Sequence, residues 1–205
     1  SGTIDGAWGS ASALTSATLT RRCPETLLVV LPRQADLDEY ADDLEAFLGE
    51  APSIFPAWDT LPNEHDVTDA VFGKRLRILR QFQGAERPKL VVTTIAALLQ
   101  PTPSRAEIQA GARTVSIGDE LDQEGFQQWL IDRGFERVTG IQLPGEFAVR
   151  GGILDLYPPD SEEPIRLEFF DTEVESIRKF DADSQRTVEN LNAVDIAIVS
   201  PVDSA

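Results

Sequence analysis

The sequence predicts an α/β protein in two parts, a first domain with a parallel sheet and a second, α+β domain with a mainly antiparallel sheet. Up to about residue 100, apolar runs alternate with segments of helical periodicity, which is the order of a parallel sheet with crossover helices. Beyond that point, short strand-like segments follow one another with turn residues between them, as in an antiparallel sheet.

The first half contains three strand candidates separated by amphipathic helices. Thr26–Leu31 is an apolar run that ends at Pro32, which is typical of a buried parallel strand. Between the strands, apolar residues recur at helical spacing. We expect strands at Thr26–Leu31, Ser53–Phe55 and Leu90–Thr94, and helices at Leu37–Leu48, Val71–Phe82 and Ile95–Leu99.

The segment Pro101-Thr102-Pro103-Ser104 breaks this pattern and is the expected domain boundary. After it, one amphipathic helix is expected at Asp122–Arg133, with Phe126, Trp129 and Leu130 facing inward. Short strands are then expected at Arg137–Leu143, Phe147–Arg150, Ile153–Tyr157, Ile165–Phe170, Val174–Phe180 and Val194–Val199. One helix packed on an antiparallel sheet makes an α+β module.

The charge and composition exclude several classes of function. Thirty-five acidic side chains face 18 basic ones, a formal net charge of −17, whereas duplex binding depends on basic groups that displace phosphate counterions. No apolar run approaches the ~20 residues that span a bilayer. Cys23 and His65 are single, so an internal disulfide is excluded and we expect a solvated His65 and no metal. We expect a cytoplasmic protein without membrane partners.

The stretch from Gly6 to Ala13 stands just before a probable helix, where a phosphate-binding loop would lie. A working loop needs a lysine against the β and γ phosphates and a Ser/Thr hydroxyl on magnesium. If Gly9 holds the place of a loop glycine, Ser12 replaces the lysine and Ala13 the hydroxyl. A degenerate loop would retain Gly6, Gly9, Ser10 and Ser12. The alternative is a helix start rich in small residues, and both interpretations predict no ATPase activity and no cofactor.

No other set of residues indicates catalysis. With one histidine and one cysteine, dyads or triads built on them are hard to assemble. Carboxylates are plentiful, but those between Asp36 and Glu45 follow the outer face of an amphipathic helix, which indicates a solvated surface. We therefore expect no catalytic residues in this chain.

Four stretches resemble the region shared by the excinuclease subunit UvrB and the transcription-repair coupling factor Mfd. They are Phe55–Pro62, Gly145–Pro158, Ile165–Phe170 and Phe180–Thr187. The resemblance covers nearly the whole chain, and the order and spacing of the stretches make it specific. The resemblance implies a first domain similar to the P-loop NTPases but degenerate over residues 1–103, a UvrA-binding domain over 104–199, and the start of a return segment to the first domain over 200–205.

The resemblance is to the coupling factors rather than to UvrB itself. UvrB has an intact phosphate loop and a long, aromatic-rich hairpin that clamps damaged DNA. Here the loop is degraded, and the run from Trp58 to Val71 is too short for that hairpin. Two alternatives stay open. One is a fragment of UvrB, a subunit with ATP-dependent damage loading, and the other is an unrelated nucleotide-binding α/β enzyme.

The resemblance implies recruitment of UvrA, the damage-recognition ATPase of nucleotide excision repair, by a part of the chain that is not itself catalytic. The positions that match UvrA-contacting residues of the family are Arg137, Arg150, Arg166, Glu168 and Phe170. Strand alternation places Arg166, Glu168 and Phe170 on one face. We expect Arg150 and Arg166 to be exposed there and Glu168 to hold the Arg166 guanidinium. Ala148 stands where UvrB has another arginine. RNA polymerase and DNA would be contacted only by parts of the full-length protein that are absent here.

Overall fold

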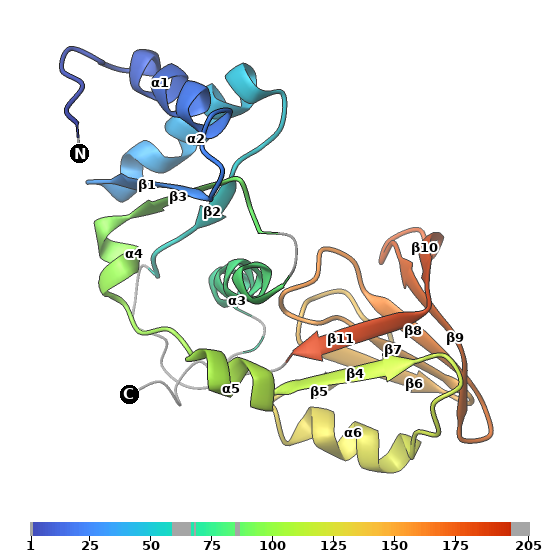
Figure 1. Ribbon diagram of the computed structural model, residues 1–205. Coiled ribbons are helices and arrows are strands. Elements are labelled where there is room, and N and C mark those ends of the chain that lie inside the picture. Colours follow the sequence, from blue (N-terminus) through green and yellow to red (C-terminus); the bar gives the residue numbers. More distant parts are fainter. Residues whose placement is uncertain (1, 59–66, 68, 85–86, 198–205) are drawn as a thin grey trace. The chain divides into compact units, whose positions relative to one another are not determined.

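The computed structural model describes residues 2–58, 67, 69–84 and 87–197, which fall into two compact units (Figure 1). The first unit comprises residues 1–60 and 78–101, and the second comprises 61–77 and 102–205. His65 and residues 200–205 lie outside the described residues, so expectations about them stay predictions. The assignment of functional domains to 1–103 and 104–199 likewise stays a prediction. Among the described residues, no helix has the length and apolar character needed to cross a membrane.

The first unit contains a three-stranded parallel sheet with the order β1-β3-β2. Its elements are α1 (Ser10–Thr20), β1 (Leu27–Leu31), the short 3-10 helix η1 (Gln34–Asp36), α2 (Leu37–Leu48), β2 (Ser53–Phe55), β3 (Leu90–Thr94) and α4 (Ile95–Leu99). Helix α3 (Ala70–Gln83) contributes residues to both units. The parallel sheet confirms the α/β prediction for this half, while the likeness to P-loop NTPases stays a proposal.

The strands of this sheet differ in burial. All five residues of the central strand β3 are buried. Strand β1 lies at an edge, and its Leu28 and Val30 side chains are 49% and 41% exposed. The prediction that this apolar run is a buried strand is therefore wrong, because within the described residues β1 pairs on one side only and helices α1 and α2 pack with Leu27, Val29 and Leu31 on its other face.

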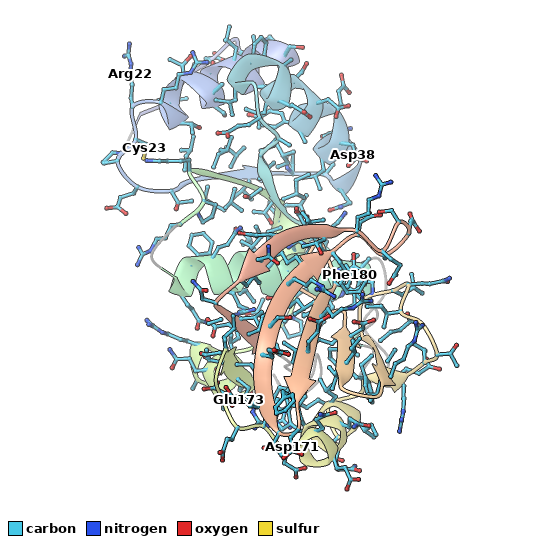
Figure 2. The ribbon with its side chains drawn as sticks, turned by 90° about the vertical axis from the view of Figure 1, so that its right-hand side faces the viewer. Arg22, Cys23, Asp38, Asp171, Glu173 and Phe180 are labelled. Atoms are coloured by element: carbon cyan, nitrogen blue, oxygen red, sulfur yellow. The ribbon has the colours of Figure 1, made fainter. Side chains whose placement is uncertain are left out.

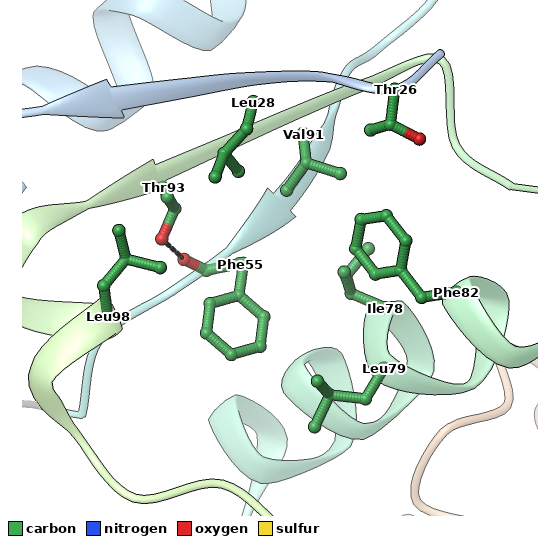
Figure 3. A pocket seen from close by; sticks show the side chains of 9 residues that line it. All are labelled: Thr26, Leu28, Phe55, Ile78, Leu79, Phe82, Val91, Thr93 and Leu98. Atoms are coloured by element: carbon green, nitrogen blue, oxygen red, sulfur yellow. Dashed lines mark hydrogen bonds between the residues drawn. The ribbon is translucent and has the colours of Figure 1, made fainter. Parts of the chain in front are cut away.

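An open apolar groove of about 320 Å³ lies beside the exposed face of β1 (Figure 3). It is lined by Thr26, Leu28, Phe55, Ile78, Leu79, Phe82, Val91, Thr93 and Leu98. At its floor the Thr93 hydroxyl donates to the carbonyl oxygen of Phe55 at 2.8 Å, which ties β3 to β2. The groove therefore has an almost entirely hydrocarbon lining.

The second unit contains a six-stranded sheet with the order β10-β9-β8-β7-β6-β5. Its strands are β5 (Glu136–Arg137), β6 (Glu146–Arg150), β7 (Ile153–Leu156), β8 (Ile165–Phe170), β9 (Glu173–Phe180) and β10 (Thr187–Leu191). All neighbouring pairs are antiparallel except β5 and β6. Strands β4 (Ala112–Ser116) and β11 (Ala193–Ala197) form a second antiparallel pair, and the helices are α5 (Arg105–Ala110) and α6 (Gln123–Ile131). The mainly antiparallel prediction is confirmed for this half.

One face of the six-stranded sheet makes the main core with α6. Phe126 and Leu130 of α6 pack against residues that alternate along the strands, such as Leu154 and Leu167. Asp122 caps this helix by accepting hydrogen bonds from the backbone N–H groups of Glu124 and Gly125. Because the alternate residues of each strand are buried here, the residues between them point to the other face of the sheet.

Candidate functional site

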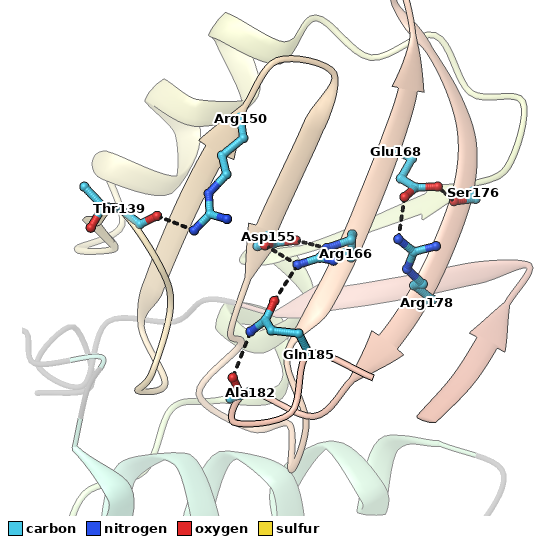
Figure 4. A network of polar contacts seen from close by, with 9 residues as sticks. All are labelled: Thr139, Arg150, Asp155, Arg166, Glu168, Ser176, Arg178, Ala182 and Gln185. Carbon is cyan, nitrogen blue, oxygen red and sulfur yellow. Dashed lines mark hydrogen bonds and ion pairs between the residues drawn. The ribbon is translucent and has the colours of Figure 1, made fainter. Parts of the chain in front are cut away.

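The face of the six-stranded sheet opposite the main core carries the candidate site. We call it the polar face; its members are Ala148, Arg150, Ile153, Asp155, Arg166, Glu168, Phe170, Ser176, Arg178 and Phe180. The strand register brings them together, since Arg166 of β8 lies opposite Asp155 of β7 and Arg178 of β9. Figure 4 shows the polar contacts that join them.

Arg166 lies in a nearly buried ion pair at the centre of this face. Its Nε donates to Asp155 Oδ1 at 2.5 Å and its Nη2 donates to Asp155 Oδ2 at 2.7 Å (Figure 4). Asp155 is only 5% exposed, and the Arg166 side chain is 15% exposed. The hydrogen bonds to Asp155 raise the pKa of the Arg166 guanidinium above its ordinary value. Arg166 therefore balances a buried carboxylate, and the expectation that it is a freely exposed arginine is wrong.

Two further contacts hold the Arg166 guanidinium in place. It lies over the buried ring of Phe180, 4.4 Å from the ring centroid, which is a favourable cation–π distance. Its Nη2 also donates to Gln185 Oε1 at 2.9 Å, and Gln185 in turn donates to the carbonyl oxygen of Ala182. The turn after β9 is therefore fastened to the polar face through Arg166.

Glu168 does not hold Arg166, and that expectation is also wrong. Its carboxylate instead accepts from Arg178 Nη2 and, at 2.7 Å, from the Ser176 hydroxyl, both on β9 (Figure 4). The physical reason is the strand register. Asp155 of β7 lies directly opposite Arg166 of β8, and its carboxylate binds the Arg166 guanidinium instead.

Arg150 and Phe170 are the exposed members of the polar face. Arg150 ends β6, and its Nη2 donates to the carbonyl oxygen of Thr139 at 2.7 Å. Phe170 ends β8 and is 76% exposed. The turn that follows it contains Asp171 with a φ of 58°, and Figure 2 shows Asp171 and Glu173 at the end of these strands away from Phe180. An exposed phenylalanine on a face that also carries arginines has the composition of a protein-binding surface.

Arg137 is not brought to the polar face. It belongs to the two-residue strand β5, where its register partner is Phe147, whose side chain lies in the main core. The predicted strand at Arg137–Leu143 is correspondingly shorter than expected. The backbone N–H groups of Gln142 and Leu143 donate to the Glu146 carboxylate and so form a loop rather than a ladder. A role for Arg137 in partner binding stays a prediction.

Sequence reasoning missed four side chains of this network: Asp155, Ser176, Arg178 and Gln185. Asp155 carried a usable signal, because it interrupts the apolar run Ile153-Leu154-Asp155-Leu156 and a buried carboxylate requires a charged partner. Arg178 and Gln185 carried none, since each lies in an ordinary polar stretch.

The stretch before α1 shows what the residues of the expected phosphate loop do. Gly6 and Gly9 have φ values of 81° and 55°, which glycine adopts readily. Ser10 begins α1, and the Ser12 hydroxyl donates to the carbonyl oxygen of Gly9 at 2.8 Å. Ser12 thus makes a local hydrogen bond at the start of the helix, in the place where the comparison with a phosphate loop would require a lysine.

We expect the chain to gain no thermal stability from millimolar Mg-ATP and to hydrolyse none of it. A ligand raises the melting temperature only if it binds the native state, and Ser12 and Ala13 offer neither a cation nor a magnesium ligand to the phosphates. Differential scanning fluorimetry with and without Mg-ATP measures the first quantity, and phosphate release measures the second. A reproducible, ATP-dependent rise in melting temperature would contradict this prediction.

Comparison with known proteins adds the family. Residues 114–200, which include the whole polar face, match the family described as the UvrB interaction domain. The chain is similar to transcription-repair-coupling factors of Mycobacterium bovis (35% identical over 192 residues, 89% of this chain), Escherichia coli (30% over 189 residues, 92%) and Bacillus subtilis (29% over 195 residues, 94%). It spans 15% to 16% of the length of these relatives. The chain therefore belongs to the UvrB-homology region of the transcription-repair-coupling factors.

Proposed function

We propose that the second unit is a non-catalytic docking module that binds UvrA and so recruits it to stalled transcription for nucleotide excision repair. The observation that carries the proposal is Phe170, which is 76% exposed on the polar face within the region that matches the UvrB interaction domain. By the same proposal, contacts with RNA polymerase and DNA belong to the remaining length of a coupling factor. No catalytic role is assigned to this chain.

The physical basis is the presence of an apolar anchor and arginines on one face of the sheet. Burial of Phe170 in a partner would remove a large aromatic surface from water. Arg150 has N–H groups left to donate after its bond to Thr139, and a guanidinium can bind a carboxylate with two parallel hydrogen bonds. Together they favour a partner surface with an apolar pocket flanked by acidic groups.

Phe170→Ala and Arg150→Ala should each weaken UvrA binding by about tenfold or more, because interface anchors typically contribute 2 kcal/mol or more. Isothermal titration calorimetry of the chain with purified UvrA measures the dissociation constant. Phe170→Ala should leave the association rate nearly unchanged since it removes no charge, whereas Arg150→Ala should slow it at low salt.

Two matched variants serve as controls. Arg105→Ala removes an exposed arginine from α5, and Val188→Ala shortens a 56% exposed side chain on β10. Both should bind UvrA within twofold of the parent. If Phe170→Ala and Arg150→Ala melt normally and bind like these controls, the polar face is not the docking site; if the parent itself fails to bind UvrA, the proposed function is wrong.

A further inference from the structure

Each oxygen of the Glu168 carboxylate has a hydrogen-bond partner within the chain. One oxygen accepts from Arg178 Nη2 and the other accepts from the Ser176 hydroxyl. Both partners stand on the neighbouring strand β9, with Ser176 directly opposite in the register. These two bonds hold the carboxylate against β9, so Glu168 is placed to orient Arg178.

Arg178 has the opposite character. Its side chain is 27% exposed, and among the contacts of the described residues its Nε and Nη1 have no hydrogen-bond partner. Arg166, its register neighbour on β8, is only 15% exposed and uses both Nε and Nη2 within the chain. After Arg150, Arg178 is therefore the arginine of the polar face with most donors available to a partner.

We propose that Arg178 is a contact residue of the docking surface and that Glu168 is its positioning residue. The inference rests on the proposed function, since the partner is the same UvrA protein, and it reassigns Glu168 from contact to support. The chemistry it requires on the partner is a carboxylate that accepts a hydrogen bond from Nη1 or from Nε of Arg178, the two nitrogens that Glu168 does not use.

Glu168 would act by reducing the rotamer freedom of Arg178. A free arginine side chain loses conformational entropy when it is immobilised, and a guanidinium already held by one carboxylate loses less on binding. Ser176 supports the same geometry by fixing the second oxygen of Glu168. Ser176 and Glu168 therefore hold the guanidinium of Arg178 in one orientation before a partner binds.

A double-mutant cycle on the 205-residue chain tests this, with binding to UvrA measured by calorimetry. Arg178→Ala should raise the dissociation constant by about tenfold, and Arg178→Lys should fall between it and the parent because the planar fork is lost. Glu168→Gln should weaken binding by about threefold in the parent but by less than twofold in the Arg178→Ala background, since its effect passes through Arg178. Lys179→Ala is the matched control, a 32% exposed cation on the same strand that is paired with Glu163 and Glu189.

The outcomes separate this inference from the proposed function. If Arg178→Ala binds UvrA as tightly as Lys179→Ala does, while Phe170→Ala binds more weakly, the inference about Arg178 is wrong and the proposed function stands. If the double variant raises the dissociation constant by the product of the two single-variant factors, Glu168 acts independently of Arg178. That result would show that Glu168 contacts the partner itself and would overturn its positioning role. Absence of binding by the parent chain would overturn both. Melting temperatures of all variants identify any loss of affinity that comes from unfolding.

Discussion

Arg166→Ala should lower the free energy of unfolding by about 3–5 kcal/mol, because it leaves the carboxylate of Asp155 buried without its partner. Asp155 is 5% exposed and both of its oxygens accept from Arg166. The variant also loses the contact of the guanidinium with the Phe180 ring and the hydrogen bond to Gln185. Chemical denaturation followed by tryptophan fluorescence measures the change.

The control for this prediction is Arg150, the exposed arginine of the polar face. Arg150→Ala removes an exposed side chain and should alter the free energy of unfolding by no more than about 0.5 kcal/mol. The double variant Asp155→Leu/Arg166→Leu should recover much of the loss, since apolar replacement of both partners removes the unpaired charge. An Arg166→Ala variant as stable as Arg150→Ala would show that Asp155 is reached by water.

This expectation changes how Arg166 variants are interpreted. Any loss of UvrA binding by Arg166→Ala would include the effect of a less stable fold as well as that of a lost contact. Phe170→Ala and Arg150→Ala remove exposed groups and avoid this difficulty. Arg166 has one guanidinium nitrogen, Nη1, without a hydrogen bond among the contacts of the described residues. Its role in partner binding stays a prediction.

Gly73→Ala should destabilise the second unit by about 1–3 kcal/mol, although alanine favours a helix over glycine. A Cβ at Gly73 would lie 2.1 Å from the carbonyl oxygen of Pro159, a backbone atom that cannot turn aside. Helix α3 therefore approaches the segment after β7 so closely that only glycine fits. The same denaturation experiment measures the effect.

Gly84, at the end of the same helix, provides the comparison. A Cβ there would meet its nearest atoms at 3.7 and 3.8 Å, which is ordinary van der Waals contact. Gly84→Ala should therefore leave the free energy of unfolding within about 0.5 kcal/mol of the parent. Equal stability of the two alanine variants would show that the Pro159 segment moves away without cost.

Elements with strong periodicity could be predicted from the sequence. The bounds of β8, Ile165–Phe170, agree with the prediction because apolar and polar residues alternate from Ile165 to Phe169 and a turn follows Phe170. The same alternation placed Arg166, Glu168 and Phe170 on one face, as the structure shows. Helix α2 was equally well predicted, since its apolar stripe ends at Gly49, whose φ is 84°.

Features that depend on contacts between distant residues could not be predicted. Strands β7 and β8 are joined by a long connection rather than a tight turn, so their register, and with it the pairing of Asp155 with Arg166, was not fixed locally. Strand β4, Ala112–Ser116, was missed because its sequence has weak apolar alternation and its partner is β11, far along the chain. Strand β10 was also missed, although it pairs with the neighbouring strand β9, because most of its residues are exposed and its sequence has little apolar alternation.

The exposed edge of β1 has a consequence for how copies of the chain behave in solution. Leu27–Leu31 is an uncharged strand whose outer backbone groups, within the described residues, pair with no other strand. Such edges can pair with a strand of another molecule. No lysine or proline interrupts it to discourage that pairing. The net charge of −17 then opposes association of copies through their mutual repulsion. Because 0.1 M salt screens charges beyond about 10 Å, the colloidal stability of the isolated chain depends on the ionic strength of its buffer.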